Sequence, residues 1–251
     1  MSVYKKLQTA RLRLVNTNIT LAFDMTIKEW AIWTWLTING TKSAALTYSN
    51  SIVTATIAAH GYVDGDIVTI SGAVQTQYNG TFVISYIDAN TFSYIPVTAP
   101  SVTPATGAIL AANYTESYFP MTTYLDDGVY DQVLHESSGI VYGTSSALYQ
   151  DNGVPINVKI RTNLFDGGNT NKKHFSKIEV VGDKINSTAY LRYSSDDYQS
   201  FCGYRPVYLL QGRSMLRRCG SSRRRAFELK HADNTPFRVE SLELDIDTGS
   251  E

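Results

Sequence analysis

The sequence predicts an all-β protein, and three observations support that class. Aromatic residues make up 12% of the 251 residues, with 17 tyrosines, and threonine, valine, isoleucine and serine are frequent. β-Branched and aromatic residues favour strands. Short alternating apolar runs are separated by Asp-Gly, Asn-Gly and Ser-Gly pairs, the pattern of antiparallel hairpins. A chain of this length can bury a substantial core and is expected to form two domains.

Paired strands are predicted at the start of the chain. Residues 10–15 alternate polar and apolar side chains and precede a turn at residues 16–18. Residues 19–25 and 29–35 are expected to form a hairpin across residues 26–28.

The sequence of this hairpin resembles that of a propeller blade. The resemblance lies in the motif Leu-Ala-Phe-Asp-Met, followed by Glu-Trp and a further Trp. In such blades a tryptophan wedges between neighbours, so Trp30 is expected to be buried. The alternative is an ordinary amphipathic hairpin with Trp30 and Trp33 in its core.

A separate small β unit is predicted at residues 49–112. Its turn signals are Asp64-Gly65 and Asn79-Gly80, between alternating apolar strands. The phrases His-Gly-Tyr, Gly-Asp-Ile-Val-Thr-Ile-Ser-Gly and Tyr-Asn-Gly-Thr-Phe resemble a small all-β module found inserted in phage virion proteins. A Pro- and Thr-rich connection at residues 98–107 leads back to the surrounding domain, where further turns are expected at Asp127-Gly128 and Ser138-Gly139.

A strand, a tight polar turn and a second strand are expected around Ser194. The spacing of Ser194, Asp196, Ser200 and Phe201 resembles the Asp-box hairpin of β-propellers, with Tyr198 in place of the usual glycine. In such a turn the Ser or Asp side chain accepts backbone N–H bonds and the aromatic residue tucks into the sheet behind. The four residues are therefore expected to shape the hairpin and not to catalyse.

Four further segments carry short sequence motifs, and the order of these motifs along the chain is informative. They carry the phrases Tyr-x-Asp-x-Gly-x-Pro-Ile, Lys-x-Phe, Arg-x-Arg-x-Phe-Glu-Leu and a closing strand, at residues 147–162, 172–182, 216–230 and 237–246. With the Ser-x-Asp hairpin, this series resembles the C-terminal part of the tail nozzle, or packaged-DNA-stabilisation, proteins of short-tailed bacteriophages.

The resemblance implies a partial or complete β-propeller-like domain interrupted by a small β-barrel or immunoglobulin-like inserted domain. The propeller-like tail domain would comprise residues 1–48 and 113–251, and the insert residues 49–112. Without the insert about 187 residues remain, enough for about four blades. Members of the family form a larger propeller from a longer chain, so this chain is expected to be a C-terminal portion, a shortened relative or a split gene product.

Charge is segregated although the net charge is only −1. Residues 43–158 contain nine acids and no lysine or arginine, whereas residues 205–230 contain eight basic residues and one acid, Glu228. The basic residues singled out are Arg217, Arg218, Arg223, Arg224 and Arg225. One expected role is contact with DNA phosphates in a tail channel. The other is structural, with the arginines stacked on tyrosines or paired with acids of a neighbouring subunit, and this second role is preferred.

The sequence gives little indication of an enzyme. Scattered histidines without metal-ligand spacing predict no metal site, and no cofactor is expected. The histidines are His60, His135, His174 and His231. Cys202 and Cys219 are expected to be free thiols. No run of 18 apolar residues is present, so no membrane span is expected.

The predicted function is that of a structural, non-enzymatic protein of the phage tail, located in the virion and assembled in the host cytoplasm. It would form a homo-oligomeric ring below the portal and adaptor, retain packaged DNA and connect other tail proteins. One alternative is a carbohydrate-binding host-attachment protein, in which Tyr62, Tyr78 and Tyr86 of the insert form a sugar platform. A sialidase-like hydrolase is the other, although no set of residues suggests its arginine triad and tyrosine nucleophile.

Overall fold

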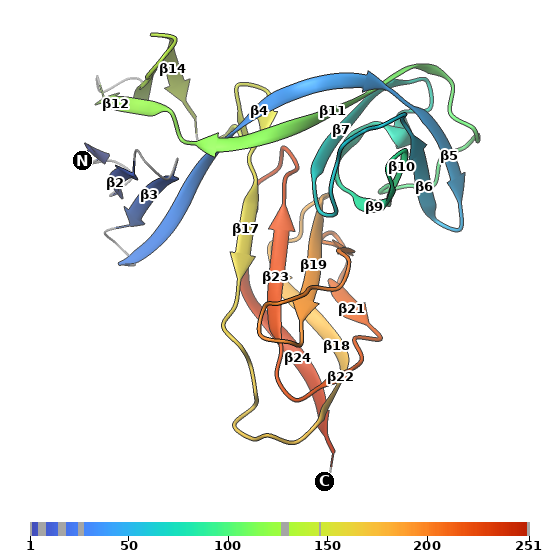
Figure 1. Ribbon diagram of the computed structural model, residues 1–251. Coiled ribbons are helices and arrows are strands. Elements are labelled where there is room, and N and C mark those ends of the chain that lie inside the picture. The colour runs from blue at the N-terminus through green and yellow to red at the C-terminus, as the bar shows by residue number, and fades with distance from the viewer. Residues whose placement is uncertain are drawn as a thin grey trace. The chain divides into compact units, whose positions relative to one another are not determined.

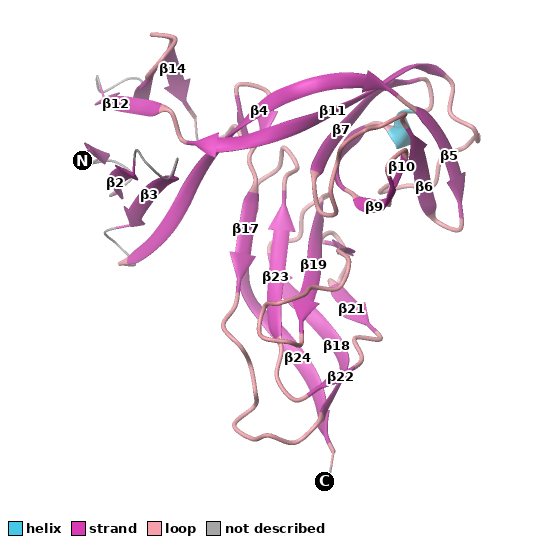
Figure 2. Cartoon of the chain, viewed as in Figure 1, coloured by secondary structure: helices cyan, strands magenta, loops and turns pink. Residues whose placement is uncertain are grey.

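The computed structural model describes residues 2–4, 9–14, 19–24, 28–126, 131–145 and 147–249, and all of its sheets are antiparallel (Figures 1 and 2). The predicted all-β class is confirmed. The chain divides into two compact units, one of residues 1–38 and 115–156 and the other of residues 39–114 and 157–251. Two long strands, β4 (Glu29–Ser43) and β11 (Gly107–Tyr118), run from one unit into the other.

The first unit contains a five-stranded arrangement in the order β1-β2-β3-β4-β11, a three-stranded sheet β12-β13-β14 and a short hairpin β15-β16. The strands not yet given are β1 (Ser2–Tyr4), β2 (Thr9–Leu14), β3 (Ile19–Asp24), β12 (Met121–Asp126), β13 (Asp131–His135), β14 (Val141–Thr144), β15 (Gln150–Asp151) and β16 (Val154–Pro155). Strands β3 and β4 form the expected hairpin, with Thr20 opposite Trp33 and Phe23 opposite Trp30.

Turn residues in this unit are only partly described. The turn expected at Ser138-Gly139 is present, and Gly139 N–H donates to the His135 carbonyl over 3.1 Å. The expected turns at residues 16–18 and 127–128, and residues 26–27 of the hairpin turn, lie outside the described residues.

The expectation that Trp30 is buried is wrong, because 58% of this residue is exposed. Side chains alternate between the two faces of a strand, and the odd-numbered Trp33 and Trp35 take the inward direction. Both pack against Phe119, with ring centroids 5.3 and 6.1 Å away. Trp30 points to the other face, where it contacts Phe23 at 4.9 Å.

The second unit begins with a sandwich of two open sheets. One has the order β11-β7-β8 and the other β5-β6-β10-β9. The elements are β5 (Ala45–Ser49), β6 (Ile52–Thr56), β7 (Ile67–Ala73), a 3-10 turn η2 (Thr76–Tyr78), β8 (Gly80–Val83), β9 (Ser85–Asp88) and β10 (Thr91–Tyr94). Both sheets contribute to one buried core, in which Leu46 and Phe92 meet Ile70 and Phe82. The described sheets of this module therefore form a sandwich and not a closed barrel.

A second sandwich follows in the same unit. One sheet has the order β17-β23-β19-β20, and in the other β18 pairs with β21, β22 and β24. Their bounds are β17 (Val158–Arg161), β18 (Lys173–Gly182), β19 (Thr188–Ser194), β20 (Arg205–Tyr208), β21 (Met215–Arg217), β22 (Ser221–Ser222), β23 (Ala226–His231) and β24 (Val239–Thr248). Their common core contains Phe175 and Ile178 from one sheet and Leu191 and Phe227 from the other.

These sheets differ from the expected propeller blades. An up-and-down blade keeps its strands in sequence order, whereas here β23 inserts between β17 and β19 (Figure 1). The late strand β24 likewise returns to pair with β18. The inward faces of two sheets pack on each other, so the C-terminal half is organised as a sandwich.

We predict that residues 43–114 fold on their own. The buried core of the module is drawn entirely from residues 46–111, and its hairpins are local. The measurement is the NMR spectrum and thermal melt of the isolated fragment, with the fragment 49–112, which lacks β5, as the matched control. A dispersed spectrum with a cooperative melt is expected for 43–114 and a weaker melt for 49–112. An unfolded spectrum for both would contradict an autonomous module.

We also predict that Gly72→Ala destabilises the chain more than Gly61→Ala. Both glycines have positive φ angles, +81° and +75°, a conformation that costs other residues about 1–2 kcal/mol. A Cβ on Gly72 would lie 2.1 Å from the Ala108 carbonyl oxygen, whereas a Cβ on Gly61 meets nothing within 4 Å. Urea unfolding of the two full-length variants should show the larger loss in the free energy of unfolding for Gly72→Ala. Equal losses would mean that the β7 and β11 backbones move apart at little cost in free energy.

Candidate functional site

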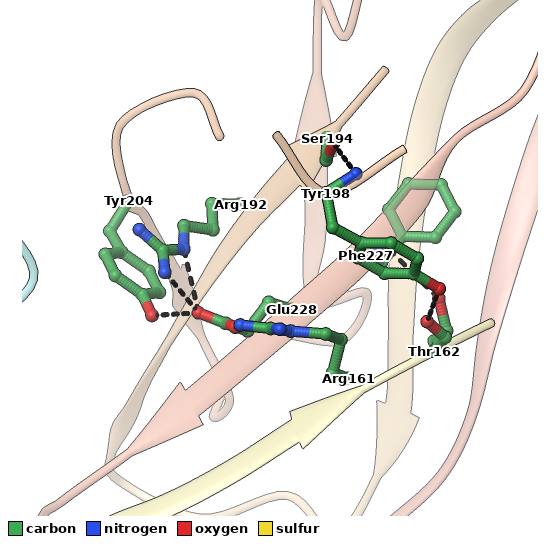
Figure 3. Close-up of polar contacts among 8 residues, drawn as sticks. All are labelled: Arg161, Thr162, Arg192, Ser194, Tyr198, Tyr204, Phe227 and Glu228. Atoms are coloured by element: carbon green, nitrogen blue, oxygen red, sulfur yellow. Dashed lines mark hydrogen bonds and ion pairs between the residues drawn. The ribbon is translucent and has the colours of Figure 1, made fainter. Parts of the chain in front are cut away.

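The most distinctive group in the second unit is a buried carboxylate between two arginines. Glu228 lies on β23, one of the two inner strands of its sheet, and is 0% exposed. The register places Arg161 of β17 opposite Glu228 on one side and Arg192 of β19 opposite it on the other. Three charged residues thus stand in a row across three neighbouring strands (Figure 3).

The carboxylate is hydrogen-bonded from several directions. Arg161 Nε donates to Oε2 and Arg192 Nε to Oε1, each over 2.8 Å, and the Tyr204 hydroxyl also donates to Oε1 (Figure 3). Burial alone would raise the pKa of Glu228, but these bonds and the Arg192 charge outweigh it and lower the pKa below its ordinary value. The charge is therefore compensated inside the fold and is not a poised acid or base.

Aromatic rings cover the arginines of this network. The Phe201 ring lies 5.1 Å from the Arg161 guanidinium and 4.5 Å from that of Arg192, and the Tyr204 ring lies 4.3 Å from Arg192. Guanidinium groups are attracted to ring faces at these distances. Phe201, expected to tuck into the sheet, is thus a cover over the arginine pair.

The Asp-box-like turn holds itself together through Ser194 and Asp196. Ser194 Oγ donates to Asp196 Oδ1 over 2.8 Å and accepts from Tyr198 N–H over 3.0 Å. Asp196 also accepts from the Ser200 N–H and hydroxyl. The hydrogen bond from the Ser200 side chain is the main cause that lowers the pKa of Asp196 to about 2. These bonds all close the turn upon itself.

Tyr198 ties the turn to the sheet although it stands where the motif has glycine. Its φ is +68°, and its hydroxyl donates to the Thr162 carbonyl over 3.0 Å (Figure 3). Thr162 Oγ1 in turn accepts from Phe227 N–H over 3.0 Å. The second strand expected directly after this turn is absent, since residues 195–204 are a loop and β20 begins at Arg205.

The five arginines singled out from the sequence do not form one surface. Arg217, Arg218, Arg223 and Arg224 are exposed, whereas Arg225 is 2% exposed. Of the exposed residues, Arg224 pairs with Asp197 and Arg223 Nη1 donates to the Thr170 carbonyl over 3.0 Å.

Arg225 belongs to the core of the second sandwich. Its guanidinium lies 4.2 Å from the Phe175 ring and 4.0 Å from the Tyr193 ring, and Nη1 donates to the Cys219 carbonyl over 2.7 Å. Burial lowers the pKa of this arginine. Stacking on a tyrosine, which the preferred role of the basic residues includes, is present for Arg225. A contact of Arg225 with DNA or with another subunit is not possible in the folded chain, because its charged group is enclosed.

Two buried lysines are held by main-chain oxygens. Lys173 Nζ donates to the carbonyls of Asn169, Asn171 and Arg223 over 2.8–3.0 Å. Lys230 Nζ donates to the Gly65 carbonyl over 2.6 Å and so joins β23 to the module of residues 44–111. These ammonium groups organise loops.

Ser187, His231 and Asp233 lie together but not as a catalytic triad. Ser187 Oγ lies 2.9 Å from His231 Nε2 and donates to Asp233 Oδ2 over 2.6 Å. In a triad the acid bonds the other ring nitrogen of the histidine and the serine proton passes to the ring. Here the carboxylate itself accepts the hydrogen bond from the serine hydroxyl. Burial lowers the pKa of His231. The group is suited to bracing β23.

The sugar platform expected on the insert is not formed. Tyr62 and Tyr78 are 2% and 0% exposed, and of the three tyrosines only Tyr86 reaches the surface. His60 braces the same module, since Tyr62 N–H donates to its Nδ1 over 2.9 Å and its Nε2 lies 2.8 Å from the Asp88 carbonyl.

The described residues contain no group of three or more His, Cys, Asp or Glu side chains placed to hold a metal ion. Nor do they form a helix long and apolar enough to cross a bilayer. Cys202 and Cys219 are free thiols, as expected.

The sequence matches no protein-family model and no curated protein. Among solved structures, the chain is similar to one titled "Phage phi92 endosialidase", with 14% identity and a TM-score of 0.25. The match covers 76% of this chain and 35% of the other, so the chain spans about a third of that protein's length. Similarity at this TM-score carries no functional argument.

Glu228, the centre of the site, is not among the residues predicted from the sequence. One signal was available: Glu228 is the one acid among residues 205–230 and stands within the strand phrase Ala-Phe-Glu-Leu. An acid in a buried strand needs cationic partners. Its partners Arg161 and Arg192 could not be named without the strand order, because β17 and β19 are separated in sequence by β18.

We predict that Glu228→Gln destabilises the chain at neutral pH by about 1.5–3 kcal/mol, because it removes the charged acceptor of buried hydrogen bonds from Tyr204 and the two partly exposed arginines. The folded-state pKa of Glu228 is lowered, so its contribution is present above the unfolded-state pKa and is lost as pH falls through the lower folded-state value. Urea unfolding of wild type and variant at pH 7, and at progressively lower pH, measures this difference.

The matched control is Glu240→Gln, which removes a carboxylate that is paired with Arg238 at the surface. Exposed pairs contribute only about 0–1 kcal/mol, so this variant should unfold nearly as wild type does. A Glu228→Gln variant as stable as the control would show that the buried network contributes nothing net.

Proposed function

We propose that this chain is a structural, non-enzymatic subunit of a short phage tail, at or near the nozzle. The observation that carries the proposal is a row of exposed apolar residues on β4, where Trp30, Ile32 and Ile38 are 58%, 61% and 57% exposed. Trp30 and Ile32 are even-numbered neighbours on one face of the strand, whereas Leu36 on that face is 5% exposed and separates Ile38 from them. Exposed apolar side chains such as those of Trp30 and Ile32 are suited to protein–protein contact.

A structural role also fits the polar groups of the second unit. Glu228, Arg225 and Lys230 are buried, and each is bonded within the chain. Such groups add rigidity and specificity to a fold but present no reactive atom to a substrate. The ordered series of phrases shared with tail nozzle proteins supplies the location that we propose, namely the tail of a virion assembled in the host cytoplasm.

The partners proposed are further copies of this chain in a ring, together with adaptor or other tail proteins. The occupant of the β4 row is proposed to be a second copy, because one surface that recurs on every copy can close identical subunits into a ring. Exposed arginines such as Arg217 and Arg218 are proposed to meet acids of a neighbouring subunit or to face packaged DNA. Retention of DNA is part of the same proposal.

Of the alternatives, the sialidase-like hydrolase has the least support. Arg161 and Arg192 are already paired with Glu228, so these arginines are not set out as an open site for a sugar carboxylate. Host attachment through the three-tyrosine platform is also disfavoured, since Tyr62 and Tyr78 are buried.

We predict that the double substitution Trp30→Ser and Ile32→Ser abolishes self-association of the purified chain. Surface substitutions of this kind usually change stability by no more than about 0.5 kcal/mol, so the monomer should keep its melting temperature. Light scattering coupled to size-exclusion chromatography over a range of concentrations gives the measurement. The matched control is Val63→Ser with Val74→Ser, at positions that are 62% and 69% exposed. Self-association that survives the β4 double variant would remove the central support of the proposal.

We predict that Arg217→Glu with Arg218→Glu impairs incorporation of the chain into tails without unfolding it, because these exposed charges would meet acids of a neighbouring subunit. Complementation of a phage that lacks the chain, with counting of assembled tails and of packaged DNA, gives the readout. The control is Lys159→Glu with Lys172→Glu, an equal charge change at exposed sites outside the basic segment. Normal tails that leak DNA would instead assign the arginines to DNA, and unchanged particles would exclude both roles.

A further inference from the structure

The second unit contains a cavity of about 310 Å³ that none of the functions above uses. Its walls come from two regions of the chain, residues 76–82 with 97–98 of the inserted module and residues 186–190 with Asp233 of the C-terminal sandwich. Both regions belong to the same compact unit. The volume is at the lower end of the range for small-molecule sites, about 300–1,000 Å³.

The chemistry of the walls is polar but almost uncharged. Hydroxyl and amide side chains predominate, and the lining includes Gln77, Thr81, Thr98, Asn186 and Thr188. Asp233 is the one ionisable acid among the lining residues, which include no lysine, arginine or histidine. A phosphate, a nucleic-acid backbone or an acidic sugar would therefore find no counter-charge here, whereas a ligand rich in hydroxyl groups would find donors and acceptors.

One of these polar groups has no hydrogen-bond partner among the residues that the structure describes. Thr188 is 4% exposed, and its Oγ1 is buried without a hydrogen bond. A buried hydroxyl left unpaired costs about 1–3 kcal/mol, so such groups call for an explanation. A ligand hydroxyl in the cavity that Thr188 lines would satisfy it.

The acid of the cavity is held in a fixed orientation. Asp233 Oδ2 accepts from Ser187 Oγ over 2.6 Å and from Thr188 N–H over 3.2 Å. Neither bond uses Oδ1. A carboxylate anchored through one oxygen is a rigid acceptor for a ligand hydroxyl at the other.

Aromatic residues complete the lining. Tyr190 and Phe82 are 4% and 5% exposed and both line the cavity, and Phe82 is stacked on Tyr94 with ring centroids 4.2 Å apart. Rigid aromatic carbon next to polar donors and acceptors suits a ring that has C–H groups on its faces and hydroxyls on its edge.

We propose that this cavity binds a neutral saccharide unit, through the Asp233 carboxylate, the Thr188 hydroxyl and the amides at its mouth. The site is distinct from the buried platform residues Tyr62 and Tyr78. It goes beyond the structural function proposed above and does not depend on it, since a tail subunit of any location could carry it.

The test uses the full chain and a panel of neutral sugars at millimolar concentration: glucose, galactose, N-acetylglucosamine, N-acetylgalactosamine, lactose and maltose. Saturation-transfer difference NMR detects binding, and sialic acid and glucose 6-phosphate are the charged comparisons. In the same titration, the methyl resonances of Thr81, Thr98 and Thr188 of the wild-type protein report whether the sugar enters the cavity. This second readout needs no variant.

Two variants sharpen the assignment. Thr188→Val removes the unpaired hydroxyl at nearly constant shape and should weaken binding about three- to tenfold, the loss of one neutral hydrogen bond, without lowering the melting temperature. Asn186→Trp at the exposed mouth should block binding. Ser222→Ala is the matched control, because Ser222 also has a buried hydroxyl without a partner but lies outside the cavity.

Binding of at least one neutral sugar, with shifts of the cavity methyl groups and loss in Asn186→Trp but not in Ser222→Ala, would support the site. The proposal is overturned if none of the neutral sugars binds, or if only the charged sugars bind. It is equally overturned if a sugar binds but leaves the Thr81, Thr98 and Thr188 methyl resonances unchanged. A failure of self-association through β4 would leave these outcomes untouched, so the two proposals fail separately.

Discussion

A carboxylate in the middle of a sheet must be given positive partners by the strands on either side, and Glu228 imposes that condition on the C-terminal sandwich. An unpaired charge at a 0% exposed position would cost several kcal/mol. Arg161 and Arg192 satisfy it only if β17 and β19 both flank β23. The non-sequential strand order and the charge network therefore require each other, and a sheet in sequence order would separate Glu228 from both arginines.

Several other residues of the sandwich contact the row formed by Arg161, Glu228 and Arg192. Tyr204 donates to the carboxylate and Phe201 covers the two guanidinium groups. The turn at Ser194 is tied to β17 by the Tyr198 hydroxyl, which donates to the Thr162 carbonyl. Arg225 directly precedes β23 and occupies a position in the core, where its guanidinium is stacked between the Phe175 and Tyr193 rings. Buried charges of this kind contribute less to net stability than apolar packing does, but they permit few alternative arrangements. The hypothesis that they specify this strand order is consistent with every one of them having partners in the chain.

The sequence predicts the class and the local hairpins better than it predicts the site. Alternation and Asn-Gly or Asp-Gly pairs are local signals, so β3–β4 and the strands of the inserted module follow from them. The outward direction of Trp30 could not be inferred, because a period of two leaves open which face of β4 is covered. Likewise the phrase Arg-Arg-Arg-Ala-Phe reads as a basic surface, although the third arginine is enclosed by Phe175 and Tyr193. Strand order and facing depend on contacts between distant residues, which spacing alone does not contain.

The bond from Lys230 to Gly65 has an evolutionary consequence. Its acceptor is a main-chain oxygen, which every amino acid possesses, so the bond itself does not depend on any side chain of the module. Position 65 is nonetheless restricted, since a Cβ on Gly65 would lie 2.6 Å from Tyr204 Cε2. The bond from the C-terminal sandwich therefore constrains the sequence of the module at one backbone position, and substitutions on the outer surface of the module leave it in place.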